Sequence, residues 1–161
     1  MMIIGEAPGR TEERDGVPFV GRSGTLLQEV LDEFGFRRRS VFVTNAVSCR
    51  PPDNKTPTKG EIKTCKAWLD YQIKRVKPKY VLLLGNVPLQ SITGKAGITK
   101  LRGRPFEQDG IVFLPTFHPA FVLRDEEANM PFLRKDIKLF RDIVDKGEIP
   151  QEDELEPRIV R

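Results

Sequence analysis

The chain has 161 residues, a hydrophobic fraction of 39% that includes ten phenylalanines, and a net charge of +4. These totals fit one globular domain and argue against a disordered chain. The longest apolar run, Tyr80–Leu84, is much shorter than the roughly 20 residues that a membrane helix needs, and no secretory signal opens the chain. We therefore expect a cytoplasmic, nucleoid-associated protein without a membrane partner.

Four short apolar runs are typical of buried strands, and they lie at residues 1–4, 41–47, 80–84 and 111–114. Helical patterns lie between these runs. An apolar stripe from Leu26 to Phe34 stops at Gly35 and predicts one helix. Thr58 and Glu61 form a capping-box pattern, which predicts a long helix that ends near Pro78. Two more helices are expected, one after Asn86 and one over residues 133–146.

Strands that alternate with helices predict an α/β fold with three layers, α/β/α, around a four-stranded parallel sheet. In open sheets of this kind, ligands bind outside the carboxyl ends of the strands. The expected strands end in residues that suit such a site: the GEAPG loop, Thr44-Asn45, Gly85-Asn86 and Pro115-Thr-Phe-His118-Pro. The sequence therefore predicts a ligand site on one rim of the sheet.

The charge is unevenly distributed along the chain. Residues 147–161 carry five acids and two arginines, a net charge of −3, which leaves +7 for residues 1–146. We expect residues 1–146 to form the domain and residues 147–161 to form a polar, acidic tail. A basic body indicates either a polyanionic partner or a generally basic surface, and charge alone does not choose between them.

Three features at the predicted rim bear on chemistry. The GEAPG loop is no dinucleotide-binding motif, because G-x-G-x-x-G is absent and Glu6 would repel a pyrophosphate. His118 is the only histidine, and the flanking prolines favour a functional position over a core position. Asn45 interrupts an apolar strand, so its amide either satisfies a turn or reads the edge of a planar base.

Three blocks of sequence together carry a resemblance to a known family: GEAPGRTEERDGVPFVGRSGTLL, VTNAVSCRPPDNKTP and PTFHPAFVLR. They closely resemble the conserved blocks of the family 4 uracil-DNA glycosylases, in the same order and spacing, over about residues 2 to 144. The resemblance implies an enzyme that hydrolyses the N-glycosidic bond of uracil in DNA and so initiates base excision repair. It also implies that uracil-containing DNA is the partner, and we expect a monomer.

The resemblance further implies roles for individual residues. Uracil has to be flipped out of the base stack before a side chain can reach its sugar. Phe19 would then stack on the uracil ring, Asn45 would read N3–H and O4, and His118 would hydrogen-bond O2 as the bond breaks. Glu6 would favour a cationic sugar or hold the attacking water. The remaining uracil contacts implied are Ala7, Glu12 and Asn54, with Glu12 expected near the C5 edge.

Ala7 marks a difference from family 1 enzymes, which carry a water-activating aspartate in the equivalent loop. A strong general base is therefore missing, and stabilisation of the leaving group and of the oxocarbenium ion should dominate. For DNA contacts we expect Arg22, Ser23, Arg102 and Arg124. The apolar residues after the histidine, Phe121, Val122 and Leu123, are either a wedge inserted into the base stack or core packing.

Cys49 and Cys65 match the third and fourth ligands of the family's [4Fe–4S] cluster, whose first two ligands form a C-x-x-C upstream of the GEAPG loop. That cluster takes four cysteines, and this sequence has two. Either the protein starts further upstream or its lineage has lost the cluster, and Met1-Met2 inside the expected first strand favours the former. We expect the cluster to be absent or incomplete in this chain, and we expect no catalytic metal.

Two other functions remain compatible with the sequence. One is a non-catalytic DNA-binding or replication-associated module on the same fold, and the other is a nucleotide-binding regulator that uses the same rim. The presence of Phe19, Asn45 and His118 together favours catalysis, because a binding module needs only the basic surface.

Overall fold

The structure is a computed structural model that describes residues 1–17 and 19–157. Five strands form one mixed sheet in the order β2-β1-β3-β5-β4. Their bounds are Met2–Gly5 (β1), Phe42–Asn45 (β2), Tyr80–Leu84 (β3), Phe106–Gln108 (β4) and Ile111–Thr116 (β5). Strands β1, β2, β3 and β5 pair in parallel, as expected from the sequence.

The expectation of only four strands is wrong, because β4 adds a fifth that runs antiparallel to β5. The strand has three residues and is not an apolar run, so the hydrophobic pattern did not reveal it. Asp109 and Gly110 join it to β5 with φ angles of 53° and 77°. Two left-handed residues in a row are typical of a tight hairpin turn, and Asp-Gly is a strong hairpin signal in a sequence.

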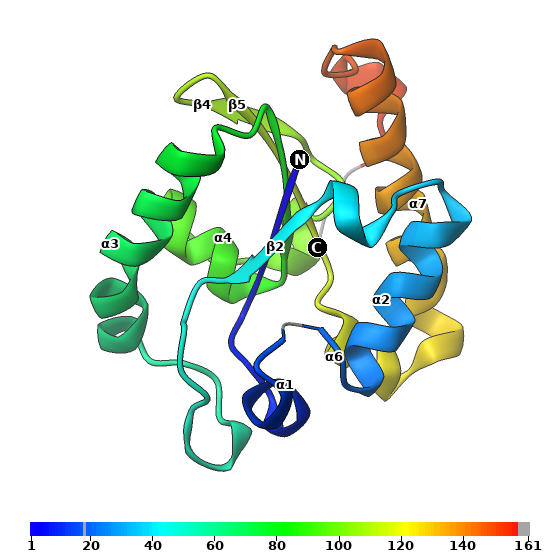
Figure 1. Cartoon of the computed structure of the whole chain (residues 1–161). Helices are drawn as coiled ribbons and strands as arrows, with labels where there is room; N and C mark the ends of the chain where they lie inside the picture. The colour runs from blue at the N-terminus through cyan, green and yellow to red at the C-terminus, as the bar shows by residue number, and fades with distance from the viewer. Residues whose placement is uncertain (18, 158–161) are drawn as a thin grey trace.

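Helices cover both faces of the sheet. Figure 1 shows α3 and α4 on one side and α2 and α7 on the other, which makes three layers. The bounds are Arg10–Asp15 (α1), Arg22–Glu33 (α2), Lys59–Val76 (α3), Asn86–Thr93 (α4), Ile98–Leu101 (α5), Pro119–Arg124 (α6) and Glu126–Lys146 (α7). Single 3₁₀ turns lie at Arg38–Ser40, Pro52–Asn54 and Glu152–Glu154.

The predicted capping box is present at the start of α3. The Thr58 hydroxyl accepts a hydrogen bond from the Glu61 N–H, and the Glu61 carboxylate accepts one from the Thr58 N–H. By contrast, the last helix begins at Glu126 and not at residue 133. Asp125 caps it by accepting from the Ala128 N–H, and Pro131 lies within the helix, where its missing N–H weakens the sequence signal.

The core consists of the sheet and the apolar stripes of the helices that pack on it. Strand β3 is buried on both faces from Val81 to Leu84. On one side Leu27 and Leu31 of α2 and Phe140 of α7 are almost fully buried, and on the other Leu69 of α3 has no exposed surface. A parallel strand that is covered on both faces reads as a continuous apolar run, which is why the sequence revealed it.

The segment expected to be a tail packs against the body as far as the structure describes it. Glu156 forms ion pairs with Arg102 and Lys135, and Arg104 donates to the Glu156 carbonyl and to the Glu152 carboxylate. Residues 158–161 lie outside the described part of the chain. Among the described residues, no helix is both long enough and apolar enough to span a bilayer.

Candidate active site

The carboxyl ends of the parallel strands meet at one rim, the lower end of the sheet in Figure 1, where α1 and α6 lie. The chain places β2 on one side of β1 and β3 on the other, so the strand order reverses between β1 and β3. A cleft of about 520 Å³ opens there. That volume lies in the range of roughly 300–1,000 Å³ that small-ligand sites occupy. Seven residues expected to contact uracil or to act on it line this cleft: Glu6, Ala7, Glu12, Phe19, Asn45, Asn54 and His118.

His118 is placed by the end of β5 and the start of α6. It is the N-cap of α6, and its Nδ1 accepts a hydrogen bond from the Ala120 N–H at 3.0 Å. Burial lowers the pKa of His118 from 6.5 to about 4. The ring is therefore neutral at pH 7, and because Nδ1 is an acceptor, the proton is on Nε2.

Gly85 makes room for this ring at the end of β3. Its φ is 91°, and a Cβ at this position would lie 3.1 Å from the His118 Cβ. The Gly85 N–H donates to the Thr116 carbonyl at 2.8 Å, which fixes the end of β5 just before the histidine. A side chain at position 85 would therefore displace His118.

Glu6 follows β1 directly and lines the same cleft. Burial raises the pKa of the Glu6 carboxyl, and the positive charge of Arg124 counteracts that effect in part. A carboxylate that is partly withdrawn from water is a better proton acceptor than a free one. Among the described residues no group hydrogen-bonds the Glu6 carboxylate, so both oxygens are open to a ligand or water.

Phe19 and Asn45 lie side by side on the wall of the cleft that β1 and β2 form. Asn45 is the last residue of β2 and pairs with Gly5 of β1. The Phe19 ring contacts Gly5, and its centroid lies 6.3 Å from that of His118 with the planes tilted by 36°. The Asn45 amide accepts or donates no hydrogen bond within the described residues, so it is available to a ligand.

Glu12 and Asn54 complete the walls of the cleft from two loops. The Glu12 carboxylate of α1 lies between Gly9 and Gly21, since a Cβ on either glycine would come within 3.3 Å of it. Asn54 ends a 3₁₀ turn and adopts a left-handed φ of 54°. Its side-chain oxygen accepts from the Arg50 Nε at 2.7 Å, which orients its amide.

The residues expected to contact DNA separate into two groups. Arg22 is exposed at the start of α2, and Ser23, Phe121 and Arg124 line the cleft. Val122 is fully buried and Leu123 packs against the core, which favours core packing over a wedge for these two residues. Phe121 alone is an exposed aromatic residue at the mouth of the cleft, with 39% of its surface exposed.

The expectation that Arg102 contacts DNA is also wrong. Its guanidinium is buried and pairs with the Asp136 carboxylate of α7, with contacts of 2.6 and 2.9 Å. It also pairs with Glu156 at 2.6 Å and lies over the rings of Phe117 and Phe132. The carboxylates that pair with Arg102 are 34 and 54 residues away in the sequence, so the sequence around Arg102 did not reveal them.

The structure adds site residues that the sequence pattern did not identify as ligands. Asn86 accepts from the N–H groups of Gly97 and Ile98 through its side-chain oxygen, at 2.9 and 2.8 Å. This bond holds the loop before α5 against the rim, where Thr99 lines the cleft. Lys55 also lines the cleft and adds a positive charge close to Asn54. Of Asn86, Thr99 and Lys55, only Asn86 had a sequence signal, because it lies at the end of an expected strand.

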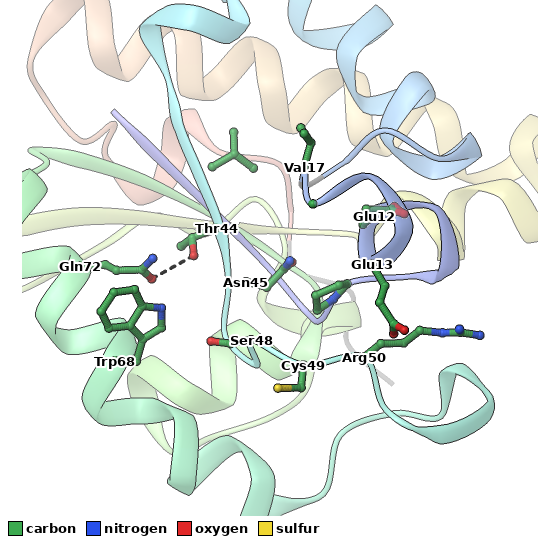
Figure 2. Close-up of a pocket in the computed structure, with 13 residues that line it drawn as sticks. Glu12, Glu13, Val17, Thr44, Asn45, Ser48, Cys49, Arg50, Trp68 and Gln72 are labelled. Carbon is green, nitrogen blue, oxygen red and sulfur yellow. Dashed lines mark hydrogen bonds between the residues drawn. The ribbon is translucent and has the colours of Figure 1, made fainter.

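A second groove of about 590 Å³ lies beside the cleft and shares Pro8, Glu12 and Asn45 with it. Figure 2 shows this groove between α1, β2 and α3, with the hydrogen bond from Thr44 to Gln72 on one wall. Trp68 lies on the same wall and is 52% exposed. The groove contains neither His118 nor Glu6. The chemistry expected from the sequence therefore belongs to the smaller cleft.

The two cysteines lie near this groove but do not make a cluster site by themselves. Cys49 is exposed after β2 and lines the groove, and Cys65 is a partly buried residue of α3. Within the described residues no three His, Cys, Asp or Glu side chains gather closely enough to hold a metal ion. A [4Fe–4S] cluster takes four thiolates. The residues present therefore do not fit such a cluster, and no chemical step is assigned to one.

Comparison with known proteins gives a consistent result. A sequence model described as the Uracil DNA glycosylase superfamily matches residues 1–144. The type-4 uracil-DNA glycosylase of Sulfurisphaera tokodaii is 39% identical over 89% of this chain and 69% of its own length. The corresponding enzyme of Thermotoga maritima is 41% identical over 81% of this chain and 69% of its own length. A DNA polymerase of Bacillus phage SP01 is 30% identical over 94% of this chain, which corresponds to 16% of the polymerase.

The family match covers every strand of the sheet and all the residues of the cleft named above. The two type-4 enzymes are similar to this chain over most of its length. This chain belongs to the uracil-DNA glycosylase superfamily and, within it, to the type-4 uracil-DNA glycosylases.

Proposed function

We propose that this chain excises uracil from DNA by hydrolysing the N-glycosidic bond of a nucleotide that has been flipped into the cleft at the end of β1 and β3. The observation that carries the proposal is that Phe19, Asn45, His118 and Glu6 line one cleft at the point where the strand order reverses. This cleft has an aromatic face, an amide, a neutral imidazole and a carboxylate, which are the groups that such a reaction needs.

Recognition of the base is assigned to Phe19 and Asn45. The Phe19 ring offers a stacking surface, and the Asn45 amide offers a donor and an acceptor side by side for uracil O4 and N3–H. Cytosine presents the opposite order of donor and acceptor at these two atoms. A dry site with a fixed amide would leave polar groups unpaired with cytosine, and such mismatches reduce rates by about 10⁴-fold.

Departure of the base is assigned to His118. As the bond between C1′ and N1 breaks, its electron pair passes to the uracil ring, and negative charge develops on O2. The Nε2–H of the neutral His118 ring would donate a hydrogen bond to this oxygen. A preorganised donor of this kind contributes about 10²–10³-fold to the rate.

Completion of the reaction is assigned to Glu6 and a water molecule. The carboxylate stabilises the positive charge that develops on the sugar, and it accepts a proton from the water whose oxygen bonds to C1′. The raised pKa of Glu6, caused by burial, suits this second role, and the positive charge of Arg124 favours the ionised form of the carboxyl. The uracil anion then takes up a proton from solvent, so the products are uracil and an abasic site.

Binding of DNA is assigned to the exposed basic residues around the mouth of the cleft. Arg22 lies in the first turn of α2, and Lys55 and Arg124 line the cleft itself. Backbone N–H groups at the start of α2 are further phosphate donors, since the N-cap Gly21 has no side chain to occupy them. Phe121 is placed to contact the bases that flank the flipped nucleotide.

A single-uracil oligonucleotide tests the proposal. The chain is incubated with the labelled duplex or single strand, and abasic sites are then cleaved with alkali. We expect cleavage at the uracil and none in a control with thymine at the same place, and we expect His118→Ala to lower the rate by about 10²–10³-fold. Absence of cleavage at a large excess of protein would contradict uracil excision by this chain.

The similarity to a segment of a phage DNA polymerase gives one observation in favour of a second function, a non-catalytic module of the replication machinery. The same assay separates the two, because such a module would bind the oligonucleotide without releasing uracil. We further propose that the protein works as a monomer on the DNA of the nucleoid, which sedimentation with and without DNA would test.

A further inference from the structure

Phe19 has an unusual backbone for an aromatic residue. Its φ is 57°, in the left-handed region that residues other than glycine, asparagine and aspartate seldom adopt. A residue held in this region is strained and persists only where its surroundings impose it. Two glycines lie against Phe19: Gly24 contacts its backbone, and Gly5 contacts its ring.

Gly24 lies against the backbone of Phe19. It is a buried residue in the first turn of α2, and a Cβ at this position would lie 2.6 Å from the Phe19 Cα and still closer to its carbonyl group. Real Cβ atoms essentially never come within 3.0 Å of such atoms. The start of α2 therefore packs on Phe19 at a distance that only glycine permits.

Gly5 lies against the ring of Phe19 and the amide of Asn45 at once. It is the last residue of β1 and pairs with Asn45 of β2. A Cβ on Gly5 would lie 2.6 Å from the Asn45 Oδ1, 3.0 Å from the Phe19 Cε2 and closer still to the Phe19 Cζ. The surface of this glycine therefore sets the spacing between the aromatic ring and the amide.

We propose that Gly5 and Gly24 are positioning residues for base recognition: Gly24 holds the Phe19 backbone, and Gly5 holds the Phe19 ring against the Asn45 amide. The inference rests on the proposed excision of uracil, because it assigns the recognition of the base to Phe19 and Asn45. Neither glycine lines the cleft, so both would act through Phe19 and Asn45, which do.

Alanine is a clean probe at both positions. Neither Gly5 nor Gly24 has a positive φ, so alanine can adopt the φ angle of either position. The added Cβ forces the Phe19 backbone to shift in Gly24→Ala, and the Phe19 ring and the Asn45 amide to shift in Gly5→Ala. Gly60 of α3 is the matched control, since it is also a helical glycine without positive φ, and the nearest atom to an added Cβ is the Thr58 Oγ1 at 3.8 Å. Gly60 lines neither the cleft nor the groove.

The first test needs no activity. His118 is the only histidine of the chain, and its ring centroid lies 6.3 Å from that of Phe19, so its NMR signals report the ring current of Phe19. We expect Gly5→Ala, Gly24→Ala and the reference variant Phe19→Ala all to shift the His118 ring signals, and Gly60→Ala to leave them unchanged. Unchanged signals in both folded glycine variants would overturn the proposal.

The second test measures the single-turnover rate of uracil excision. Inhibition by free uracil is measured beside it, because free uracil reports binding of the base without the DNA backbone. We expect each glycine variant to lose about 10²-fold in rate, the usual effect of a misplacement of 1 Å. The affinity of Gly5→Ala for DNA with an abasic site should stay within about twofold, since phosphate contacts are separate from base contacts. Free uracil should inhibit both variants less than the unmodified chain.

A double-mutant cycle separates positioning from stability. In the Phe19→Ala background, Gly24→Ala should lose almost no further activity, because its effect acts through the missing ring. In the same Phe19→Ala background, Gly5→Ala should still lower the rate, but by less than in the unmodified chain, because only the part that acts through Asn45 remains. Full additivity of Gly24→Ala with Phe19→Ala would overturn the proposal. If Gly24→Ala does not fold, the cycle of Gly5→Ala with Phe19→Ala tests the proposal instead. The closest contact of an added Cβ at position 5 is the Phe19 ring, so removal of that ring should relieve part of the effect of Gly5→Ala.

The two proposals fail in different ways. If the unmodified chain releases no uracil, the proposed function fails, and the His118 signals still decide whether the glycines position Phe19. If the unmodified chain releases uracil and the glycine variants match it in rate and inhibition, only the positioning role fails.

Discussion

At the residue scale, the protonation of His118 follows from its surroundings. Its Nδ1 accepts from a backbone N–H, and burial lowers its pKa from 6.5 to about 4. A histidine that is neutral when folded and protonated when unfolded weakens folding in acid. Its contribution to stability should therefore be fully present above pH 6.5 and should be lost as the pH falls from 6.5 to about 4.

Urea denaturation at pH 7.5 and pH 5 checks this expectation. The unmodified chain should lose more free energy of unfolding between the two pH values than His118→Ala, which has no imidazole to protonate. Equal losses in the two proteins would show that His118 does not have its lowered pKa. The rate of uracil excision should likewise stay independent of His118 protonation down to about pH 4.

Asn45 gives a second prediction at this scale. In Asn45→Asp the amide donor becomes a carboxylate, which can accept from the exocyclic amine of cytosine. We therefore expect a lower rate with uracil and a relative gain with cytosine, measured on matched oligonucleotides. Asn129→Asp, on α7 and outside the cleft, is the matched control. An unchanged preference for uracil in Asn45→Asp would show that another group reads the base edge.

The residues of the cleft were predictable to different degrees, for a physical reason. Glu6, Asn45 and His118 lie at or just after the carboxyl ends of parallel strands, and those ends meet, so their proximity could be inferred from the sequence. Arg102 could not be assigned in this way. Its partner Asp136 is 34 residues away on α7, and local sequence does not show which charges a fold pairs.

At the scale of elements, long apolar runs predicted β3 and the capping pattern predicted α3, because both signals are local. Strand β4 was missed because its own sequence has no strand pattern. It is a strand because it pairs with β5. The start of α7 was missed because Pro131 interrupts the pattern, while Asp125 caps the helix ahead of it. Elements that depend on neighbours are less predictable than elements with their own signals.

The third prediction concerns Cys49, in the loop after β2, and Cys65 of α3. Two thiols do not satisfy the four positions of a [4Fe–4S] cluster, and no third group lies near enough among the described residues. We expect the purified 161-residue chain to contain no stoichiometric iron, measured by iron analysis and by absorbance in the visible range. A brown protein with about four iron atoms per chain would contradict this expectation.

At the scale of the whole molecule, one buried network joins four parts of the chain. The Asp136 carboxylate of α7 accepts from Arg102 in the loop after α5, and from the Thr116 hydroxyl at the end of β5 at 2.6 Å. Arg102 also pairs with Glu156 from the segment that was expected to be a free tail. Thr116 is two residues before His118, so the network supports the loop that carries the imidazole.

The fourth prediction follows from the burial of this network. Asp136 is 1% exposed and the Arg102 side chain 7%, so removal of one partner leaves a charge in the interior without its counterpart. Loss of one partner of a buried pair costs about 3–5 kcal/mol. We expect Asp136→Ala to lower the free energy of unfolding by that amount in a urea titration.

Two further variants show whether the charge pair or the whole helix is responsible. Asp142→Ala is a control at a partly buried position of the same helix whose carboxylate has no hydrogen bond or ion pair among the described residues. It should change stability by less than about 0.5 kcal/mol, because it breaks no buried pair. Glu156→Gln should have an intermediate effect, because its side chain is 38% exposed and water screens its attraction to Arg102. If Asp136→Ala costs no more than Asp142→Ala, the buried pair does not hold β5, α7 and the C-terminal segment together. The support for the His118 loop would then come from the apolar contacts of Phe117 with Phe121 and Phe132.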